Sequence, residues 1–421
     1  RAETALALAN DRFAQARALT RTIVFDIYDK ADKVSGTLEV REALVGVVRE
    51  YIKGLQLDTA APSDVLLEVG IITSRLADLY GGIGIANLGK NELSRELFLD
   101  AEKTLDEVLT RDPADSVAIL ELIMVERMLC MQDVYQTRNL ASARAHNKRG
   151  FDLVEQGLAL KDENAPRILR HFWSLRTDLL QILENEKNNE EALEKVVEWR
   201  AEITPDLATR MDGSEEMGAY LAMQHAATLI ALNRGAEAIE PLDYTIAYRT
   251  KELEKKPDSY YQLTQLMVAH GELASASRLA GNLEAAAQHA DKAVELSREI
   301  MAANPDDAGG PEGVSVMLQK RATAQSALGN ASEARRALDE SQSLMGGLVK
   351  QFPGDVFYEA NLLHIAAQAV EVDMAAGASA WSCGLIRQVR SSFDVDARLA
   401  DPAFVPDRTG LEPYLKATCP A

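Results

Sequence analysis

Histidine is the residue type that most often serves as a metal ligand or a general base, so the six histidines of this chain are the first candidates for such chemistry. The sequence contains no His-x-x-x-His or His-Glu-x-x-His pair, the spacings that place two imidazoles on one helical face around zinc. A neutral imidazole near a helix crossing can instead pack and donate one hydrogen bond. We therefore expect no metal, no cofactor and no catalytic histidine among these positions: His146, His171, His225, His270, His289 and His364.

The three cysteines show no Cys-x-x-Cys spacing, which argues against a zinc or redox motif. Cys130 lies in a Met-Leu-Cys-Met run and is expected to be a buried thiol. Cys383 and Cys419 lie near the C-terminus, and a disulfide between them would suit an oxidising compartment. Two unrelated thiols are the alternative.

Two segments come close to catalytic motifs. Residues 84–91 nearly match a phosphate-binding loop, but Asn91 replaces the Ser or Thr that would bind magnesium, and no strand precedes the loop. A glycine-rich turn between helices explains the segment better. The segment around Ser315 lacks the second glycine of the Gly-x-Ser-x-Gly motif that forms a nucleophile elbow. We expect this chain not to be an enzyme.

Composition narrows both the fold class and the partners. Hydrophobic residues make up 47% of the chain and aromatic residues only 5%, which favours closely packed helices over sheets. The formal net charge of −20 repels phosphate backbones and anionic lipids, so nucleic acid is not an expected partner. No apolar run is long enough to span a membrane. The expected class is all-α.

Self-alignment reveals a period of about 48 residues. Pro257, Pro305 and Pro353 are 48 residues apart, and a proline cannot continue a helix interior, so each closes a repeat. Asn233, Gly281 and Gly329 share one register position, where a left-handed residue would turn the chain between two helices. Small residues follow each turn, where antiparallel helices must approach closely: Ser94, Ala143, Ala192, Ala238, Ala286 and Ala334.

These landmarks predict a solenoid of six helix pairs over residues 61–376. The layout is similar to tetratricopeptide repeats, although that family has a shorter period of about 34 residues. We expect the extra length mainly in the second helix and the linker after it. Residues 1–60 are expected to form a long helix and a second helix, and residues 377–421 a capping tail containing one more helix near residues 378–391.

The opening of the chain carries a second resemblance. Residues 11–19, 23–29 and 35–37, together with the Asn-Leu-Gly step at residues 87–89, resemble the region that follows the membrane helix in bacterial serine/threonine kinases with a C-terminal tetratricopeptide region. The resemblance implies a segment of a longer protein, located outside the inner membrane, that acts as a sensor or interaction region. The kinase motifs themselves are absent from this sequence.

Partner contacts are expected on the first helix of each pair, which lines the concave side of such arrays. Counting back from each turn gives six candidates, with ordinary core packing as the alternative: Met128, Tyr135, Tyr220, Met223, Arg278 and Gln319. Tyr and Met favour adaptable contact with a protein or peptide over capture of a terminal carboxylate. The leading interpretation is a non-catalytic interaction region that binds a partner or itself. A freestanding cytoplasmic scaffold or the regulatory array of a transcription regulator is the alternative.

Overall fold

The computed structural model describes residues 61–83, 87–211, 213–377, 380–395 and 397, together with Val40. This part of the chain contains fifteen helices and no strand, which confirms the all-α class. The helices expected within residues 1–60 and the last part of the tail lie outside the described residues. The helices are α4 (Ser63–Gly81), α5 (Asn91–Arg111), α6 (Ser116–Tyr135), α7 (Leu140–Leu160), α8 (Ala165–Asn185), α9 (Asn189–Glu202), α10 (Pro205–Arg210), α11 (Ser214–Ala231), α12 (Gly235–Lys255), α13 (Tyr260–Leu279), α14 (Leu283–Ala303), α15 (Gly309–Ala327), α16 (Ala331–Gln351), α17 (Val356–Ala375) and α18 (Ala380–Ser392).

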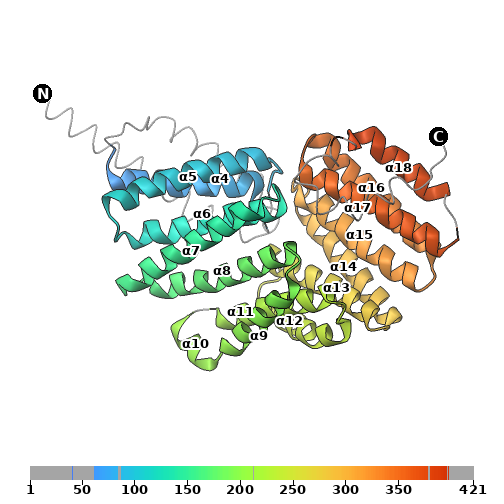
Figure 1. Cartoon of the computed structure of the whole chain (residues 1–421), viewed down its shortest axis with the longest axis horizontal. Coiled ribbons are helices and arrows are strands. Elements are labelled where there is room, and N and C mark those ends of the chain that lie inside the picture. The colour runs from blue at the N-terminus through green and yellow to red at the C-terminus, as the bar shows by residue number, and fades with distance from the viewer. Residues whose placement is uncertain are drawn as a thin grey trace, which may run out of the picture.

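The helices are arranged as successive antiparallel pairs (Figure 1). In the order of the chain, the first helices of the pairs are α4, α6, α8, α11, α13, α15 and α17, and each packs on the second helix that follows it. The short helix α10 is an insert between the third and fourth pairs. The six small residues that marked the repeat in sequence all have fully buried side chains, at 0% exposure. They lie at the crossing of the two helices, as their register predicts.

The turn inside each of the first six pairs contains one residue with positive φ, always five positions before the small residue. Gly281 and Gly329 have φ values of 82° and 80°, and Asn233 has 59°, as the sequence pattern predicts. The equivalent positions of earlier pairs are Gly89 at 68°, Arg138 at 55° and Lys187 at 62°. The repeat thus imposes a left-handed turn even where the residue has a side chain that disfavours it.

The three register prolines lie just beyond the ends of α12, α14 and α16, each of which is 21 residues long. First helices are nearly as long, for example 20 residues in both α6 and α13. The expectation that the second helix and its linker hold most of the extra length was therefore wrong. Both helices are longer because a longer first helix needs an equally long partner to cover its apolar surface.

First helices are covered on several sides, and their sequences reflect this. The residues of α6 are apolar around most of the helix, whereas α14 and α16 show a polar outer side and an apolar inner side. Several first helices begin with a side-chain cap: Asp115 accepts hydrogen bonds from the backbone N–H groups of Val117 and Ala118, at 3.1 and 3.0 Å. Such caps satisfy backbone donors that the helix leaves unpaired.

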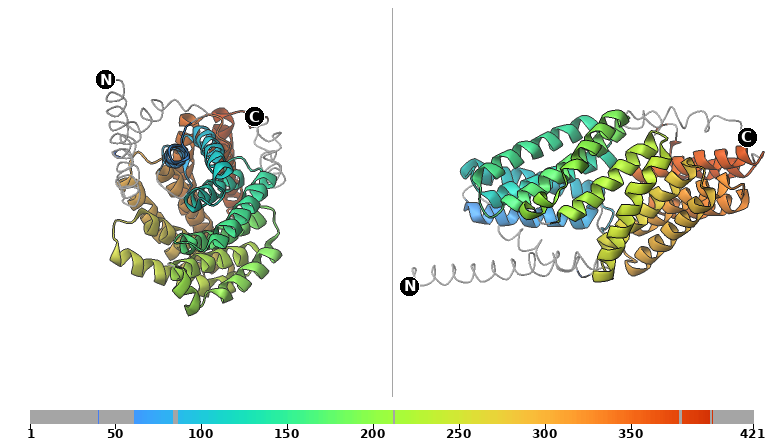
Figure 2. Two further views of the ribbon diagram at one scale, coloured as in Figure 1. Left: turned by 90° about the vertical axis from the view of Figure 1, so that its left-hand side faces the viewer. Right: turned by 90° about the horizontal axis from the view of Figure 1, so that it is seen from below.

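The stack of pairs is curved. First helices of neighbouring pairs pack against each other at every step, and for the most part much more closely than the second helices do. In a curved stack the more closely spaced elements lie on the inside, so the first helices form the inner face. Figures 1 and 2 show the pairs following a bent path that brings the N-terminal pairs near the C-terminal pairs.

The two ends of this path touch, in what we call the closing contact. The backbone N–H of Asn87 donates to Asp307 at 3.0 Å, and the N–H of Ala308 donates to the Asn87 carbonyl at 3.1 Å. The side-chain amide of Asn91 donates to Asp355 at 2.8 Å. The first turn of the solenoid therefore rests on the linkers that precede α15 and α17.

None of the helices in the described residues is both long and apolar enough to cross a membrane.

Candidate partner-binding surface

A series of polar contacts joins consecutive first helices along the inner face. Between α6 and α8, Arg127 donates to both carboxylate oxygens of Asp178 at 2.7 and 3.1 Å. Tyr135 donates to Gln181, which in turn donates to Gln224, so that one chain of hydrogen bonds crosses α6, α8 and α11. These bonds fix the spacing of the first helices and place amide and phenol groups on the inner face.

The series continues into the C-terminal pairs. The Thr228 hydroxyl on α11 donates to Glu184 on α8 at 2.8 Å. The Lys320 ammonium on α15 donates to Glu272 on α13 at 3.0 Å. The charged side chains of this series are paired, and the Gln181 amide and Tyr135 phenol are half-buried. Such a face can exchange hydrogen bonds with a polypeptide without removing an unpaired charge from water.

Two titratable groups on this face have shifted pKa values. Burial raises the pKa of Glu184 to about 7, with Glu272 adding to the rise and the hydrogen bond from Thr228 opposing it. Burial lowers the pKa of His364 on α17, and the positive charges of Arg138 and Lys187 lower it further. The turns inside the second and third pairs thus lie close enough to α17 of the seventh pair to influence the charge of His364.

All six residues expected to contact a partner lie on first helices. Met223 and Gln319 are buried, and the other four are half-buried. Met128 packs against the hydrophobic core of the first three pairs, and Tyr135 contributes its hydroxyl to the hydrogen-bond series. Their role as partner contacts stays a prediction.

The expectation omitted Arg127, Gln181, Gln224 and Lys320, which form the polar series. Their positions on first helices could be read from the repeat register. Their pairing could not, because it depends on how far each first helix slides along the next. A count of polar residues on the predicted first helices would have drawn attention to them.

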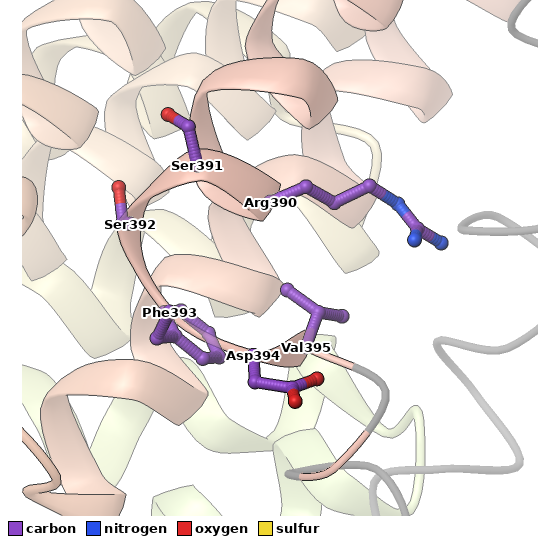
Figure 3. Close-up of a pocket in the computed structure, with 6 residues that line it drawn as sticks. All are labelled: Arg390, Ser391, Ser392, Phe393, Asp394 and Val395. Atoms are coloured by element: carbon purple, nitrogen blue, oxygen red, sulfur yellow. The ribbon is translucent and has the colours of Figure 1, made fainter.

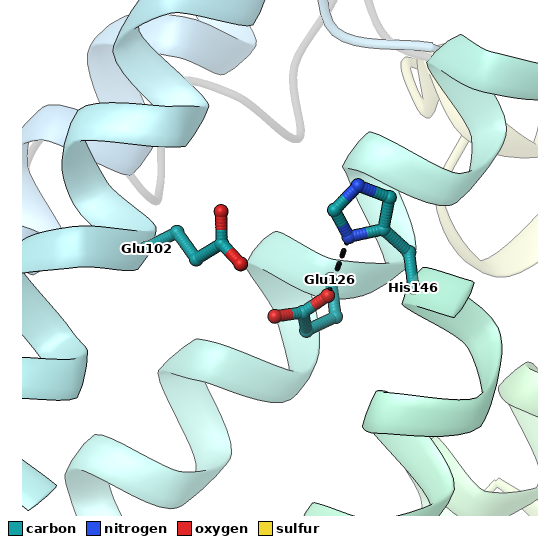
Figure 4. Close-up of side chains that lie close together, drawn as sticks. All are labelled: Glu102, Glu126 and His146. Atoms are coloured by element: carbon teal, nitrogen blue, oxygen red, sulfur yellow. Dashed lines mark hydrogen bonds and ion pairs between the residues drawn. The ribbon is translucent and has the colours of Figure 1, made fainter. Parts of the chain in front are cut away.

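A second cluster of chemical groups lies between α5, α6 and α7 and contains Glu102, Glu126 and His146 (Figure 4). The His146 Nδ1 atom lies 2.7 Å from Glu126 Oε2, and Arg149 Nη1 lies 2.9 Å from Glu126 Oε1. Arg149 also bonds to Glu102 and Asp106 on α5. Burial and the neighbouring Glu126 carboxylate raise the pKa of Glu102.

The remaining features are structural. Ser315 is fully buried and its hydroxyl contacts the Ser341 hydroxyl at 2.7 Å, which leaves no room for a nucleophile's substrate. Gly89 carries the left-handed turn, and the adjacent residues 84–86 of the loop resembling a phosphate-binding motif lie outside the described residues. A shallow pocket at the end of α18 is lined by consecutive residues of one segment, 390–395 (Figure 3). It brings no distant groups together.

Cys130 is a free, buried thiol, as expected. Burial raises its pKa far above the ordinary thiol value, so it is unreactive at neutral pH. Cys383 on α18 is buried and disulfide-bonded. Cys419 lies outside the described residues, so the pairing of these two cysteines stays a prediction.

Comparison with known proteins connects this geometry to a fold. No family model matches the chain, and no curated protein matches its sequence. Among solved structures, a Rap protein in complex with competence and sporulation factor superposes with a TM-score of 0.52 at 10% identity, over 95% of this chain and 99% of the Rap chain.

More distant likenesses are found to two further structures. One is a signal-transduction ATPase with a tetratricopeptide repeat sensor from Pyrococcus horikoshii, with a TM-score of 0.44, 16% identity and coverage of 90% and 50%. The other is yeast Tom70, with a TM-score of 0.36, 14% identity and coverage of 86% and 68%. The Rap likeness and the seven helix pairs of the described residues together show that this chain has a tetratricopeptide-like helical repeat fold.

Proposed function

We propose that this chain is a non-catalytic interaction module that binds an extended protein or peptide segment along its inner face. The observation that carries the proposal is the polar series on the first helices, which presents half-buried amide, phenol and paired charged groups over several consecutive repeats. Tetratricopeptide-like arrays receive peptides and helices on this side. The Rap structure, solved with a bound factor, supports the same use of the fold.

The inner face favours one kind of partner. Charged side chains of the described polar series are paired, as Arg127 is with Asp178 and Lys320 with Glu272, which disfavours a phosphate or a terminal carboxylate as its ligand. The half-buried Gln181 instead offers an amide whose donor and acceptor groups match a peptide backbone. We expect an extended segment of mixed composition, bound with moderate affinity.

We further propose that the chain is the sensor region of a bacterial membrane serine/threonine kinase and lies outside the inner membrane. The sequence resemblance of residues 11–37 and 87–89 supports it, as does the disulfide bond of Cys383. A cytoplasmic scaffold remains the alternative function. Thiol counting on denatured, unreduced protein from the native host separates them: one free thiol supports the extracytoplasmic assignment, and three contradict it.

Reversing one charge on the inner face and one on the outer surface tests whether the partner binds along the inner face. Peptides that bind the full chain would first be selected from a random library, and their affinity would then be measured by fluorescence anisotropy. We expect Lys320→Glu to weaken binding at least about tenfold, or about 1.4 kcal/mol, because the inner face then carries an unpaired negative cluster with Glu272.

The control is Lys292→Glu on α14. Lys292 pairs with Glu295 at 2.9 Å on an exposed outer surface, so this variant makes the same charge change away from the inner face. We expect its affinity to match that of the wild type. Equal weakening by both variants, or none by either, would contradict binding along the inner face.

A further inference from the structure

Three potential metal ligands from three helices converge between the first two helix pairs. Glu102 lies on α5, Glu126 on α6 and His146 on α7, and their ligand atoms all lie within 4.8 Å of one another. Figure 4 shows the two carboxylates and the imidazole turned toward a common point. Glu126 is fully buried, so one side of this point is closed to water.

A fourth residue lies where the orienting partner of a metal-bound histidine is needed. His146 directs Nδ1 toward Glu126, and its other nitrogen, Nε2, lies 3.8 Å from Asp133 Oδ2. That oxygen belongs to a fully buried carboxylate and accepts no hydrogen bond from any described residue. Metal-bound histidines almost always donate their second N–H to a carboxylate, a backbone carbonyl or a water, which orients the ring and raises its basicity, and Asp133 Oδ2 is placed to be such an acceptor.

The charge of the cluster also favours a divalent cation. Glu102, Asp106, Glu126 and Asp133 supply four carboxylates, whereas Arg149 and Arg95 supply only two positive charges. Arg149 occupies the Oε1 side of Glu126 and leaves Oε2 to His146. With a neutral imidazole, two negative charges remain in a mostly buried site, and a divalent ion would balance them.

We propose that Glu102, Glu126 and His146 bind a divalent transition metal of the zinc class, with Asp133 positioning His146. One imidazole and two carboxylates form a ligand set that suits Zn²⁺ better than Ca²⁺ or Mg²⁺, which prefer all-oxygen sites. The ion would join α5 of the first pair to α6 and α7 of the second pair. This site is separate from the inner-face series and does not depend on the proposed partner binding.

The pair His270 and His289 is the main competing metal site. Their Nδ1 atoms lie 3.1 Å apart and their rings are stacked, but no third ligand among the described residues completes the set. A pair of accessible histidines can bind Zn²⁺ weakly at high concentration. The double variant His270→Gln/His289→Gln therefore serves as the matched control.

Titration calorimetry of the full chain with ZnCl₂, after removal of bound metal with a chelator, tests the proposal. We expect one Zn²⁺ per chain, with affinity weakened at least about tenfold in both Glu102→Gln and His146→Gln and unchanged in the control double variant. Circular dichroism of each variant in chelator checks folding. Asp133→Asn, which keeps all three ligands, should weaken Zn²⁺ by a similar factor.

Two further measurements make the result decisive. Co²⁺ should give the intense visible absorption of a four-coordinate site in the wild type and lose it in His146→Gln. Zn²⁺ should raise the urea midpoint of the wild type and of the control, but not of His146→Gln. Absence of stoichiometric binding in the wild type, unchanged binding in His146→Gln, or loss of binding in the control double variant would each overturn the proposal.

Discussion

At the scale of single residues, the left-handed turns show where the repeat conflicts with its own sequence. Gly89, Gly281 and Gly329 adopt positive φ without penalty, whereas Arg138 and Lys187 adopt it with full side chains. The left-handed conformation costs a residue with a Cβ atom roughly 1–2 kcal/mol. The second and third pairs therefore contain strain that the glycine turns of the first, fifth and sixth pairs avoid.

Replacing Lys187 by Gly should relieve this strain. We expect Lys187→Gly to raise the free energy of unfolding by about 1 kcal/mol, since its φ of 62° suits glycine and its side chain is exposed. Urea unfolding followed by circular dichroism gives the measurement. Lys187→Ala, which keeps the Cβ atom, is the control and should not stabilise; equal effects of the two variants would exclude strain relief.

Glu184 predicts a pH dependence. Its pKa is raised to about 7 in the folded protein, mainly by burial, with Glu272 raising it and Thr228 and Lys187 lowering it. An acid whose pKa is raised on folding contributes stability that is complete below its unfolded pKa of about 4.3 and is lost as the pH rises through about 7. Glu184→Gln should remove this part of the slope.

The comparison is between urea midpoints at pH 5 and pH 8. Between pH 5 and pH 8 we expect the wild type to lose on the order of 1 kcal/mol more free energy of unfolding than Glu184→Gln loses. If both proteins lose the same stability between these two values, burial of Glu184 does not control its ionisation.

At the scale of helices, neighbouring helices approach each other closely where one of them has a glycine. A Cβ atom added to Gly150 on α7 would lie 2.5 Å from Leu175 Cδ2 on α8. Because this leucine is fully buried and cannot move outward, we expect Gly150→Ala to destabilise by roughly 1–3 kcal/mol. Thermal unfolding measures the change.

Gly346 on α16 is the matched control, since a Cβ atom there would meet nothing within 4 Å. Gly346→Ala should stabilise by roughly 0.5–1 kcal/mol through helix propensity alone. The two substitutions are chemically identical, so a difference in sign isolates the packing of α7 on α8. Stabilisation by both would show that these helices are not in close contact.

Many of the helices and turns could be predicted from the sequence. The prolines, the small residues and the Asn and Gly turns indicated the ends and crossings of α11 to α16, and one more helix was expected near residues 378–391, where α18 lies. The length of the first helices was missed because the apolar residues of α6 and α13 are spread around the helix and show no clear periodicity. Arg138 and Lys187 gave no turn signal, because neither residue type favours positive φ.

The candidate sites were less accessible to sequence reasoning. First helices could be identified as the inner face, but the contacts Arg127–Asp178 and Tyr135–Gln181 join residues 51 and 46 positions apart, whose alignment depends on the curvature of the stack. Glu102, Glu126 and His146 come from three helices, so no local spacing connects them. Local motifs report ligands on one helix, not ligands that meet through packing.

At the scale of the whole molecule, the closing contact restricts the solenoid to one curvature. Gly89 allows it, because a Cβ atom there would lie 2.7 Å from the Phe352 ring and 2.8 Å from Ala308. Asn91 adds a hydrogen bond to Asp355. The contact joins residues more than 200 positions apart and therefore depends on every repeat between them.

Asn91→Asp should open this contact by placing a carboxylate against Asp355, 2.8 Å from the present donor. We expect a larger radius of gyration in small-angle X-ray scattering and a loss of stability on the order of 1 kcal/mol. Asn282→Asp at the exposed start of α14 makes the same change away from any such partner and should alter neither quantity. An unchanged radius in Asn91→Asp would mean that the curvature does not need this contact.

Hydrogen–deuterium exchange with and without a library-selected peptide shows directly whether the inner face binds an extended polypeptide segment. We expect the peptide to slow exchange in the first helices α6, α8, α11, α13 and α15, on which the polar series lies. Exchange in the second helices α7, α12 and α14 should change little. Protection confined to those second helices would contradict binding along the inner face.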